Sequence, residues 1–400
     1  MNILFPYLAR WHAANHTRFH HLLHHAAARG HEVTVVQMPM LTRSREIGFT
    51  EMQAVPVRGV RVLDLEVPRR LWRLRCPGEK VAKKLLFARL LRSQLGDLCR
   101  SYDIDILMGY NVPHVPLLRR FPGTRVFDIA DDNVALILEE FPAGLNTLAA
   151  AAVRRGMAQG AAQADVTFTV SDRLRRTYPS AVLLPNGAPR EWLTAPPVAL
   201  CRPQMDRPVV GYVGAFEHFI DLRAVLEAAA TLPEFGFLLV GGGRLLAKTK
   251  EEIAQRGLRN CTLTGPVSYS EVPALIAEMD VCLCPFRLRP VSHAASPLKF
   301  FEYLALGRVV VASRTEELVR LASSACFFVD GGGEIAQTLR GLQSGRLDWE
   351  TRVNTARHLI AGQYNWTAIG DTMLETIQHA QEQVGYRRPA RPRETQLVAG

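Results

Sequence analysis

Long apolar runs are missing from this 400-residue sequence, and its first residues, MNILFPYLARWHAANH, contain no basic segment followed by an apolar one. A membrane-spanning helix needs about 20 consecutive apolar residues. A secretion signal needs a basic region followed by about 7–15 apolar residues. We therefore expect neither a spanning helix nor a cleaved secretion signal.

Cysteine is scarce: the chain has seven, an odd number, mostly set in apolar runs such as DVCLCPF. Such cysteines behave as small buried hydrophobic residues, and disulfides are rare in reducing compartments. Cys282 and Cys284 are two apart in an expected strand, so their side chains point to opposite faces and are unsuited to share a metal. We expect a cytoplasmic protein without disulfides.

Two common cofactor motifs are also absent. Gly241–Gly243 follows an apolar run but is not part of a G-x-G-x-x-G pattern, which gives a nicotinamide or flavin enzyme little support. Seven of the twelve histidines lie in the first 31 residues, and the pairs His20/His24 and His21/His25 have helical spacing. No H-E-x-x-H motif accompanies them, and two ligands do not complete a zinc site, so we expect no metal.

Acidic residues are outnumbered. The formal net charge is +10, and +8 of it lies between Arg69 and Arg100, where ten Lys/Arg accompany two acidic residues. No known nucleic-acid-binding module is recognised, so we expect no nucleic-acid partner. Apolar residues alternate with these cations. Residues 69–100 are therefore either a peripheral contact with an anionic membrane surface or a solvated helix whose apolar side packs in the core.

The composition, with 48% hydrophobic and 22% charged residues, is that of a globular protein, and 400 residues exceed one hydrophobic core. Short apolar runs alternate with longer helical patterns in both halves, which predicts parallel sheets covered on both faces. We therefore predict an α/β protein with two Rossmann-like, doubly wound parallel-sheet domains that face a ligand-binding cleft.

The expected strands are 2–5, 32–37, 60–65, 105–110, 124–130 and 166–170 in the first half, and 209–213, 236–240, 261–264, 281–285 and 308–312 in the second. The predicted organisation is a first domain over 1–190, a linker over 191–208, a second domain over 209–366, a last helix over 367–385 and a disordered tail over 386–400.

The segment from Ser296 to Gly307 carries the most chemistry. Ser296 is a good N-cap and Pro297 fits a first helical turn, so a helix is expected to begin here and include Leu298. Its free N–H groups and Lys299 suit a diphosphate, and Glu302 on the same face suits the two hydroxyls of a ribose. The alternative is a capped helix with one surface Lys–Glu pair.

The run S-P-L-K-F-F-E-Y-L-A-L-G-R-V-V-V looks like the nucleotide-sugar-binding segment of bacterial glycosyltransferases with the GT-B fold. The sequence resembles their group-1/family-4-like branch, which acts on surface polysaccharides and other glycoconjugates. Further matches along most of the chain are RFHHL, RGHEV, VFDIADD, VSDRL and LPNG in the first half, and VGYVG with Asp221, LTGPVSY and DVCLCPF in the second.

The resemblance implies that the C-terminal half binds a nucleotide-diphosphate sugar as co-substrate, that the N-terminal half binds the acceptor, and that the last helix crosses back to the first domain. It also implies that no metal cofactor is needed, because a helix dipole and Lys299 neutralise the leaving diphosphate. Many relatives carry two glutamates eight positions apart. Here the position eight before Glu302 is Ala294, so only the ribose-type glutamate transfers.

Further donor-binding candidates follow the expected strands of the second half. Gly214 permits the backbone to approach phosphate, and Glu217 and His218 are predicted to face the sugar. Gly242 lets the chain pass near the base or phosphates, and Arg244 is a candidate phosphate partner. The structural alternatives are an ordinary strand-to-helix turn and a solvated arginine.

Asp131 and Asp132 end an expected strand at the edge that should face the cleft. One of them would serve as general base on an acceptor hydroxyl if the reaction inverts configuration, or the pair would orient hydroxyls if it retains configuration. The alternative for Asp132 is a helix cap. Asp128, within the strand, is expected to be structural.

Trp11, His12, Asn15 and Arg18 follow the first expected strand. We predict that they bind the acceptor, because an aromatic ring with amide and guanidinium groups suits a sugar face and its hydroxyls. Trp11 would equally suit a lid or the core.

The sequence thus predicts a metal-independent glycosyltransferase that moves a sugar from a nucleotide-diphosphate donor to a hydroxyl of a glycan, a lipid-linked carrier or a small molecule. Lys299 and Asp131 or Asp132 are its candidate catalytic side chains. The alternatives that stay open are a nucleotide-sugar epimerase, a phosphorylase, and a catalytically silent nucleotide-sugar-binding or interaction protein, the last consistent with Ala294.

Overall fold

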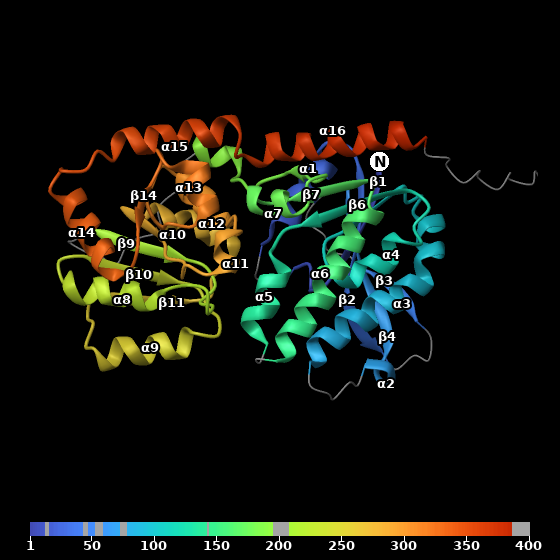
Figure 1. The fold of residues 1–400 in the computed structure, drawn as a ribbon, viewed down its shortest axis with the longest axis horizontal. Coiled ribbons are helices and arrows are strands. Elements are labelled where there is room, and N and C mark those ends of the chain that lie inside the picture. Colours follow the sequence, from blue (N-terminus) through green and yellow to red (C-terminus); the bar gives the residue numbers. More distant parts are fainter. Residues whose placement is uncertain are drawn as a thin grey trace, which may run out of the picture.

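The computed structural model describes residues 1–12, 16–42, 47–52, 59–72, 78–141, 144–194 and 208–385. They form two lobes that lie side by side, each built on one sheet (Figure 1). The N-terminal lobe contains an eight-stranded sheet and the C-terminal lobe a six-stranded sheet. All neighbouring strands are parallel except one pair at the edge of the first sheet, so the predicted fold class is confirmed.

The sheet of the N-terminal lobe has the order β3-β4-β2-β1-β5-β6-β7-β8. Its strands are β1 (Asn2–Tyr7), β2 (Glu32–Thr42), β3 (Gly48–Glu51), β4 (Val60–Pro68), β5 (Ile106–Gly109), β6 (Thr124–Ile129), β7 (Val166–Thr169) and β8 (Val182–Leu183). The six expected strands are all present. The sequence missed β3 and β8, which lie at the two edges and are too short to give a hydrophobic period.

Helices cover both faces of this sheet because its strands are apolar on both sides. They are α1 (Arg18–Ala28), α2 (Arg69–Trp72), α3 (Glu79–Ser101), α4 (Val115–Leu118), α5 (Asn133–Glu140), α6 (Leu145–Gln163) and α7 (Asp172–Thr177). Ile3 and Phe5 of β1 pack with α1 on one face, whereas Leu4 packs with α3 and α4 on the other. This alternation is what a pleated strand imposes.

The sheet of the C-terminal lobe has the order β11-β10-β9-β12-β13-β14. Its strands are β9 (Val209–Val213), β10 (Gly236–Val240), β11 (Cys261–Gly265), β12 (Val281–Cys284), β13 (Val309–Ser313) and β14 (Phe327–Val329). Its helices are α8 (Leu222–Thr231), α9 (Leu246–Gln255), α10 (Val272–Ala277), α11 (Pro290–His293), α12 (Leu298–Ala305), α13 (Glu316–Ala322), α14 (Gly332–Gln343) and α15 (Glu350–Gly362). The strand order reverses between β9 and β12, and ligands of open α/β sheets bind at the carboxyl edge of such a point.

The last helix, α16 (Trp366–Val384), lies against the N-terminal lobe. Figure 1 shows α15 over one lobe and α16 over the other, end to end along the same edge of the molecule. His25 Nε2 is 2.8 Å from Asp371 Oδ1, and Arg29 donates to Asp371 Oδ2 at 2.6 Å. Of the predicted linker, 195–207 lies outside the described residues, as does the predicted tail over 386–400.

The basic segment gives α2 and α3, with 73–77 outside the described residues. The apolar side of α3 is buried from Phe87 onward, as the core interpretation of this segment requires. Its first turns differ, because Val81 and Leu85 remain 47% and 50% exposed beside lysines. Among the described residues, no helix is both long and apolar enough to cross a bilayer.

The structure shows no disulfide among the described cysteines, which are Cys99, Cys261, Cys282, Cys284 and Cys326; positions 76 and 201 lie outside the described residues. Neither these cysteines nor the histidine-rich start of the chain forms a group of three or more potential metal ligands within the part of the chain that the structure describes.

Candidate active site

Helix α12 begins one residue later than the sequence predicted. Pro297, in an extended conformation, occupies the N-cap position, and Leu298 is the first helical residue. The prediction that Ser296 caps the helix is wrong, because its side chain is buried and its Oγ has no hydrogen-bond partner among the described residues. The carbonyl oxygen of Ser296 accepts a hydrogen bond from Asn186 Nδ2, which holds this residue outside the helix.

Lys299 in the first turn of α12 reaches the loop that follows β9. Its Nζ donates to the hydroxyl of Tyr212 at 2.8 Å and lies 4.4 Å from the centre of that ring. Burial lowers the pKa of Lys299 to about 8, while the nearby Cys284 and Glu302 oppose this shift. The ammonium is thus fixed in place and less hydrated than a surface lysine.

Two glycines allow the loops after β9 and β10 to approach this ammonium. At Gly214, with φ of 147°, a Cβ would collide with Nζ and Cε of Lys299. At Gly241, with φ of 134°, a Cβ would collide with the carbonyl group of Gly214. Both conformations disfavour residues with a side chain. Backbone is therefore exposed beside Lys299 where any side chain would block it.

Glu302 lies one turn deeper in α12 and is only 5% exposed. Its Oε1 accepts a hydrogen bond from the hydroxyl of Tyr269 at 2.8 Å. Burial raises the pKa of Glu302 to about 7, although this hydrogen bond and Lys299 both favour the charged form. The N-terminal lobe reaches the same point, because the ring of His16 stacks on Tyr269 with centroids 4.4 Å apart.

These groups line a cleft of about 530 Å³. The structure brings together six of the predicted donor-binding residues on its wall, which are Gly214, Glu217, Gly242, Leu298, Lys299 and Glu302. Sequence reasoning missed His16 and Tyr269, which also line it, and Tyr212, which holds Lys299. These residues contact partners that are 33 to 253 positions away in the sequence, and local sequence patterns do not reveal contacts over such separations. Both tyrosines nevertheless occur in the motifs quoted above.

Four predicted donor residues do not line the cleft: Ser296 and Pro297, which precede α12, and His218 and Arg244. His218 is not among the residues that line the cleft, and its ring packs edge-on against Phe219 at 5.4 Å. The guanidinium of Arg244 pairs with Glu217 at 2.9 Å and, across the gap between the lobes, with Glu140 of α5 at 3.0 Å. Arg244 thus makes a contact between the lobes, and its side chain is 64% exposed, as the solvated-arginine alternative expected.

The prediction that Trp11 binds the acceptor is wrong. Trp11 is 2% exposed, packs in the core of the N-terminal lobe, and stacks on His20 with centroids 3.9 Å apart. No sugar can stack on a ring that is covered in this way. His12 is exposed but does not line the cleft, and Asn15 lies outside the described residues.

Arg18 is likewise turned away from an acceptor. Its side chain is 4% exposed, and Nε pairs with Asp128 Oδ2 at 3.0 Å. Its other donors go to Asn186 Oδ1 at 2.8 Å and to the carbonyl oxygen of Leu184 at 3.1 Å. Burial raises the pKa of Asp128, and Arg18 opposes that shift. Arg18 is therefore a structural residue, and Asp128 has the structural role expected of it.

The neighbouring carboxylates Asp131 and Asp132 differ in environment. Asp132 caps α5, because its Oδ1 accepts from the amide of Ala135 at 2.9 Å. Asp131 is exposed at the surface. Partial desolvation by the surrounding protein raises the pKa of its carboxyl group to about 6, an effect that Arg18 opposes and Asp128 reinforces. Neither residue is among those that line the cleft of Lys299 and Glu302.

Residues 207–343 match the family model described as glycosyl transferases group 1. TuaH of Bacillus subtilis, named for teichuronic acid biosynthesis, is 33% identical over 105 residues, 26% of each chain. The 2-deoxystreptamine glucosyltransferase of Streptomyces kanamyceticus is 35% identical over 88 residues, 21% of this chain and 23% of that protein. Each match thus spans about a quarter of the curated relative.

The fold is similar over a longer range. The structure of sucrose-phosphate synthase from Thermosynechococcus elongatus superposes with a TM-score of 0.72 over 96% of this chain and 100% of that chain, at 15% identity. The two parallel-sheet lobes and the cleft between them therefore define a protein of the GT-B fold class. Within that class, residues 207–343 match the group 1 glycosyltransferases, the family that the sequence resembles.

Replacing Arg18 tests the buried ion pair. Arg18→Met should lower the free energy of unfolding by about 3–5 kcal/mol, because it leaves the carboxylate of Asp128 buried and unpaired. Arg29→Met is the matched control: Arg29 follows the same helix, and its partly exposed pair with Asp371 should contribute at most about 1 kcal/mol. Urea unfolding measures both, and equal losses in the two variants would show that the buried pair has no special role.

Proposed function

We propose that this protein is a glycosyltransferase that moves a sugar from a nucleotide-diphosphate donor to a hydroxyl group of a glycan, a lipid-linked carrier or another acceptor. One observation carries the proposal: Lys299, Glu302 and the backbone at Gly214 line one cleft at the carboxyl edge of the C-terminal sheet. A cation, exposed backbone and a carboxylate one turn deeper in the helix match the order of diphosphate and ribose in a nucleotide.

In this proposal, Lys299 exchanges the Tyr212 hydroxyl for an oxygen of the diphosphate, and backbone amides near Gly214 bind the same group. Glu302 exchanges or shares its Tyr269 partner with the two ribose hydroxyls. The bond between the anomeric carbon and the diphosphate oxygen breaks as the acceptor oxygen bonds to that carbon. Lys299 then stabilises the negative charge that develops on the leaving diphosphate, without a metal in this role.

Asp131 is the better of the two candidate bases for the acceptor. A group with a pKa of about 6 is largely ionised at neutral pH and can take up the proton of the acceptor hydroxyl if the reaction inverts configuration. If configuration is retained, the same carboxylate orients that hydroxyl. Asp132 caps the N-terminus of α5, which makes it a weaker candidate.

The position of the missing second glutamate is filled by a methyl group. Ala294 is 1% exposed and packs with the core of the N-terminal lobe, so no charged group is available there. Glu217, which lines the cleft, is the carboxylate that we propose contacts the sugar in its place. Its present partner, Arg244, also pairs with Glu140 of the other lobe.

A peripheral membrane contact suits the first turns of α3. Val81 and Leu85 expose apolar side chains on a helix that also carries Lys80, Lys83 and Lys84. An anionic bilayer surface attracts such a mixture, because each cation near it contributes roughly 1 kcal/mol. An acceptor on a lipid carrier at the inner face of the membrane would then lie close to the N-terminal lobe.

Lys299→Ala tests the assignment of the diphosphate. The variant should fold normally and lose about 10²–10³-fold in kcat/KM, since a charge on the leaving group is no longer stabilised. Sugar transfer and release of free nucleoside diphosphate, tested with a panel of UDP and GDP sugars, measure the effect. Lys250→Ala, at an exposed position on α9, is the control. Unchanged turnover in Lys299→Ala would contradict the assignment, and donor binding without transfer by the wild type would favour the catalytically silent alternative.

The affinity for a nucleotide sugar should depend on pH in two directions. Below about pH 7 Glu302 takes up a proton and accepts one hydrogen bond fewer, whereas above about pH 8 Lys299 loses its charge. Binding should therefore be strongest between these values. Calorimetry with an intact nucleotide sugar, whose phosphates do not titrate in this range, measures the profile. Glu302→Gln should remove the acidic limb and leave the alkaline one; a profile unaltered by this change would refute the role of Glu302.

The paired substitutions Asp131→Asn and Asp132→Asn separate the two carboxylates. Asparagine is as good an N-cap as aspartate, so Asp132→Asn should keep its fold and nearly all of its activity. Asp131→Asn should lower kcat by about 10²-fold or more with little change in donor affinity, because the group that accepts the proton is lost. The opposite order of effects in a transfer assay would move the acceptor role to Asp132.

A further inference from the structure

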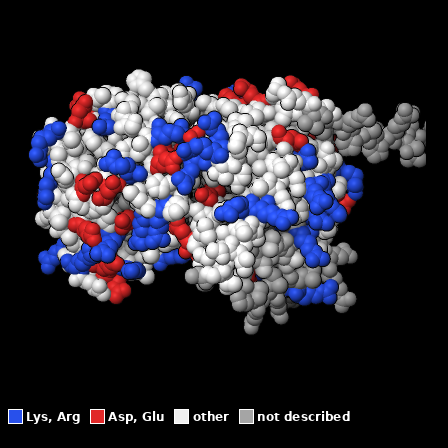
Figure 2. Space-filling view, viewed as in Figure 1, with Lys and Arg blue, Asp and Glu red and all other residues white. Residues whose placement is uncertain are grey.

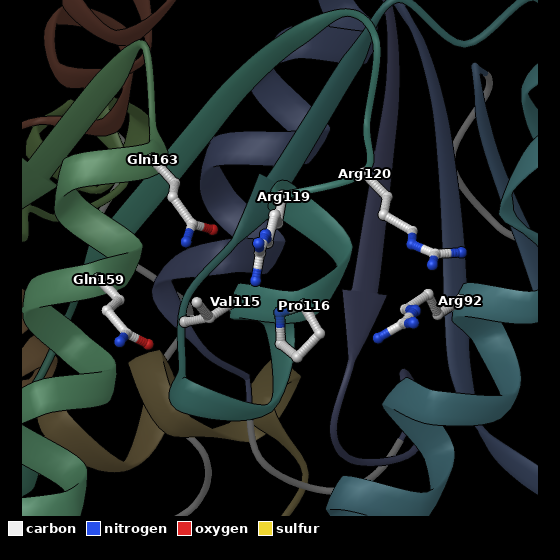
Figure 3. Close-up of a pocket in the computed structure, with 7 residues that line it drawn as sticks. All are labelled: Arg92, Val115, Pro116, Arg119, Arg120, Gln159 and Gln163. Atoms are coloured by element: carbon white, nitrogen blue, oxygen red, sulfur yellow. The ribbon is translucent and has the colours of Figure 1, made fainter.

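A second hollow of about 540 Å³ lies in the N-terminal lobe, between α3, α4 and α6. Its lining consists of three arginines, two glutamines and the apolar pair Val115 and Pro116. Figure 3 shows Gln159 and Gln163 of α6 on one side, Arg119 in the middle, and Arg92 and Arg120 on the other side. None of these residues lines the donor cleft, so the hollow is a separate site.

Among the described residues, no ion pair compensates the charges of this hollow. Arg92, Arg119 and Arg120 form no ion pair with any of the described residues, and no acidic side chain is part of the described lining. Other arginines of the same lobe are paired, as Arg125 is with Asp165 at 2.7 Å. Figure 2 shows the same contrast: Lys and Arg dominate over α3 and α4, whereas both signs alternate over the C-terminal lobe.

The walls of the hollow are held by close packing. Helix α6 approaches the sheet at Gly160, where a Cβ would lie 2.6 Å from the ring of Phe127, and approaches Val112 at Gly156. Val115 is buried beneath the arginines and packs with the core of the lobe. The helices that carry these residues are therefore closely packed against the lobe, even though the arginine side chains are exposed.

A phosphate group fits this combination. Each guanidinium presents N–H groups in a planar fork that matches two phosphate oxygens, and bringing three cations together is favourable once an anion lies between them. The glutamine amides supply further donors and acceptors from the opposite wall. Oε1 of Gln163 is buried without a hydrogen-bond partner among the described residues, and a hydroxyl beside the phosphate would satisfy it.

We propose that the hollow between α3, α4 and α6 binds a phosphate ester, held by Arg92, Arg119 and Arg120 with Gln159 and Gln163 on the facing wall. Two sources share this chemistry: the headgroup of an anionic phospholipid, and a free phosphorylated compound such as a sugar phosphate. The proposal does not depend on donor binding in the cleft, and it differs from a diffuse contact between α3 and a membrane because it requires these residues in particular.

The test compares Arg119→Gln/Arg120→Gln with a matched control, Arg89→Gln/Arg100→Gln, which removes the same charge from α3 outside the hollow. Both are made in the Lys299→Ala chain, so that a phosphate bound in the donor cleft does not contribute. One arm titrates glycerol 3-phosphate and inorganic phosphate at fixed ionic strength, followed by calorimetry. The other measures sedimentation with phosphatidylglycerol vesicles, with phosphatidylcholine vesicles for comparison.

The double variant in the hollow should weaken binding by about tenfold or more in at least one arm, since each lost charge-assisted hydrogen bond costs roughly a factor of ten. The control should change it by less than about threefold. Loss confined to the soluble phosphates identifies a free ligand, and loss confined to phosphatidylglycerol vesicles identifies a lipid headgroup. Equal losses in both variants, or no loss in either arm, would overturn the proposal. Circular dichroism confirms that all variants are folded.

Discussion

The buried ion pair of Arg18 and Asp128 is the constraint on which the geometry of the cleft depends. Asp128 belongs to β6, and Arg18 begins α1; Arg18 then binds Asn186, which in turn donates to the carbonyl oxygen of Ser296. A chain of polar contacts without exposed links thus joins the sheet of the N-terminal lobe to the residue just before the helix of Lys299. Because these side chains are buried, breaking any one of the contacts would leave a charged or polar group without a partner and out of reach of water.

Lys299 and Glu302 show what this positioning achieves. Burial shifts the two pKa values toward each other, to about 8 for the lysine and about 7 for the glutamate, because it penalises the charged form of both. Tyr212 and Tyr269 compensate part of that penalty with hydrogen bonds of 2.8 Å. A ligand with a diphosphate and two hydroxyls would take over these hydrogen bonds, so little reorganisation is needed when it binds.

The sequence predicts the fold better than it predicts the site, and particular residues show why. Strands such as β9 and β13 are continuous apolar runs, and α12 combines a periodic apolar face with Pro297 at its start and a glycine at its end, so local patterns suffice. Arg18 and Trp11 fall in a segment whose pattern suits an acceptor site equally well. Their burial is decided by partners up to 168 positions away, which no local pattern contains.

The donor cleft and the hollow of the N-terminal lobe would hold phosphate by different physical means. The cleft uses one lysine, whose charge is sensitive to burial and is lost as the pH rises past about 8. The hollow uses three arginines with exposed side chains, and a guanidinium stays protonated at any pH at which the protein is folded. An increase in pH should therefore release a nucleotide sugar while a phosphate ester in the hollow stays bound, so the pH dependence of binding alone distinguishes the two sites.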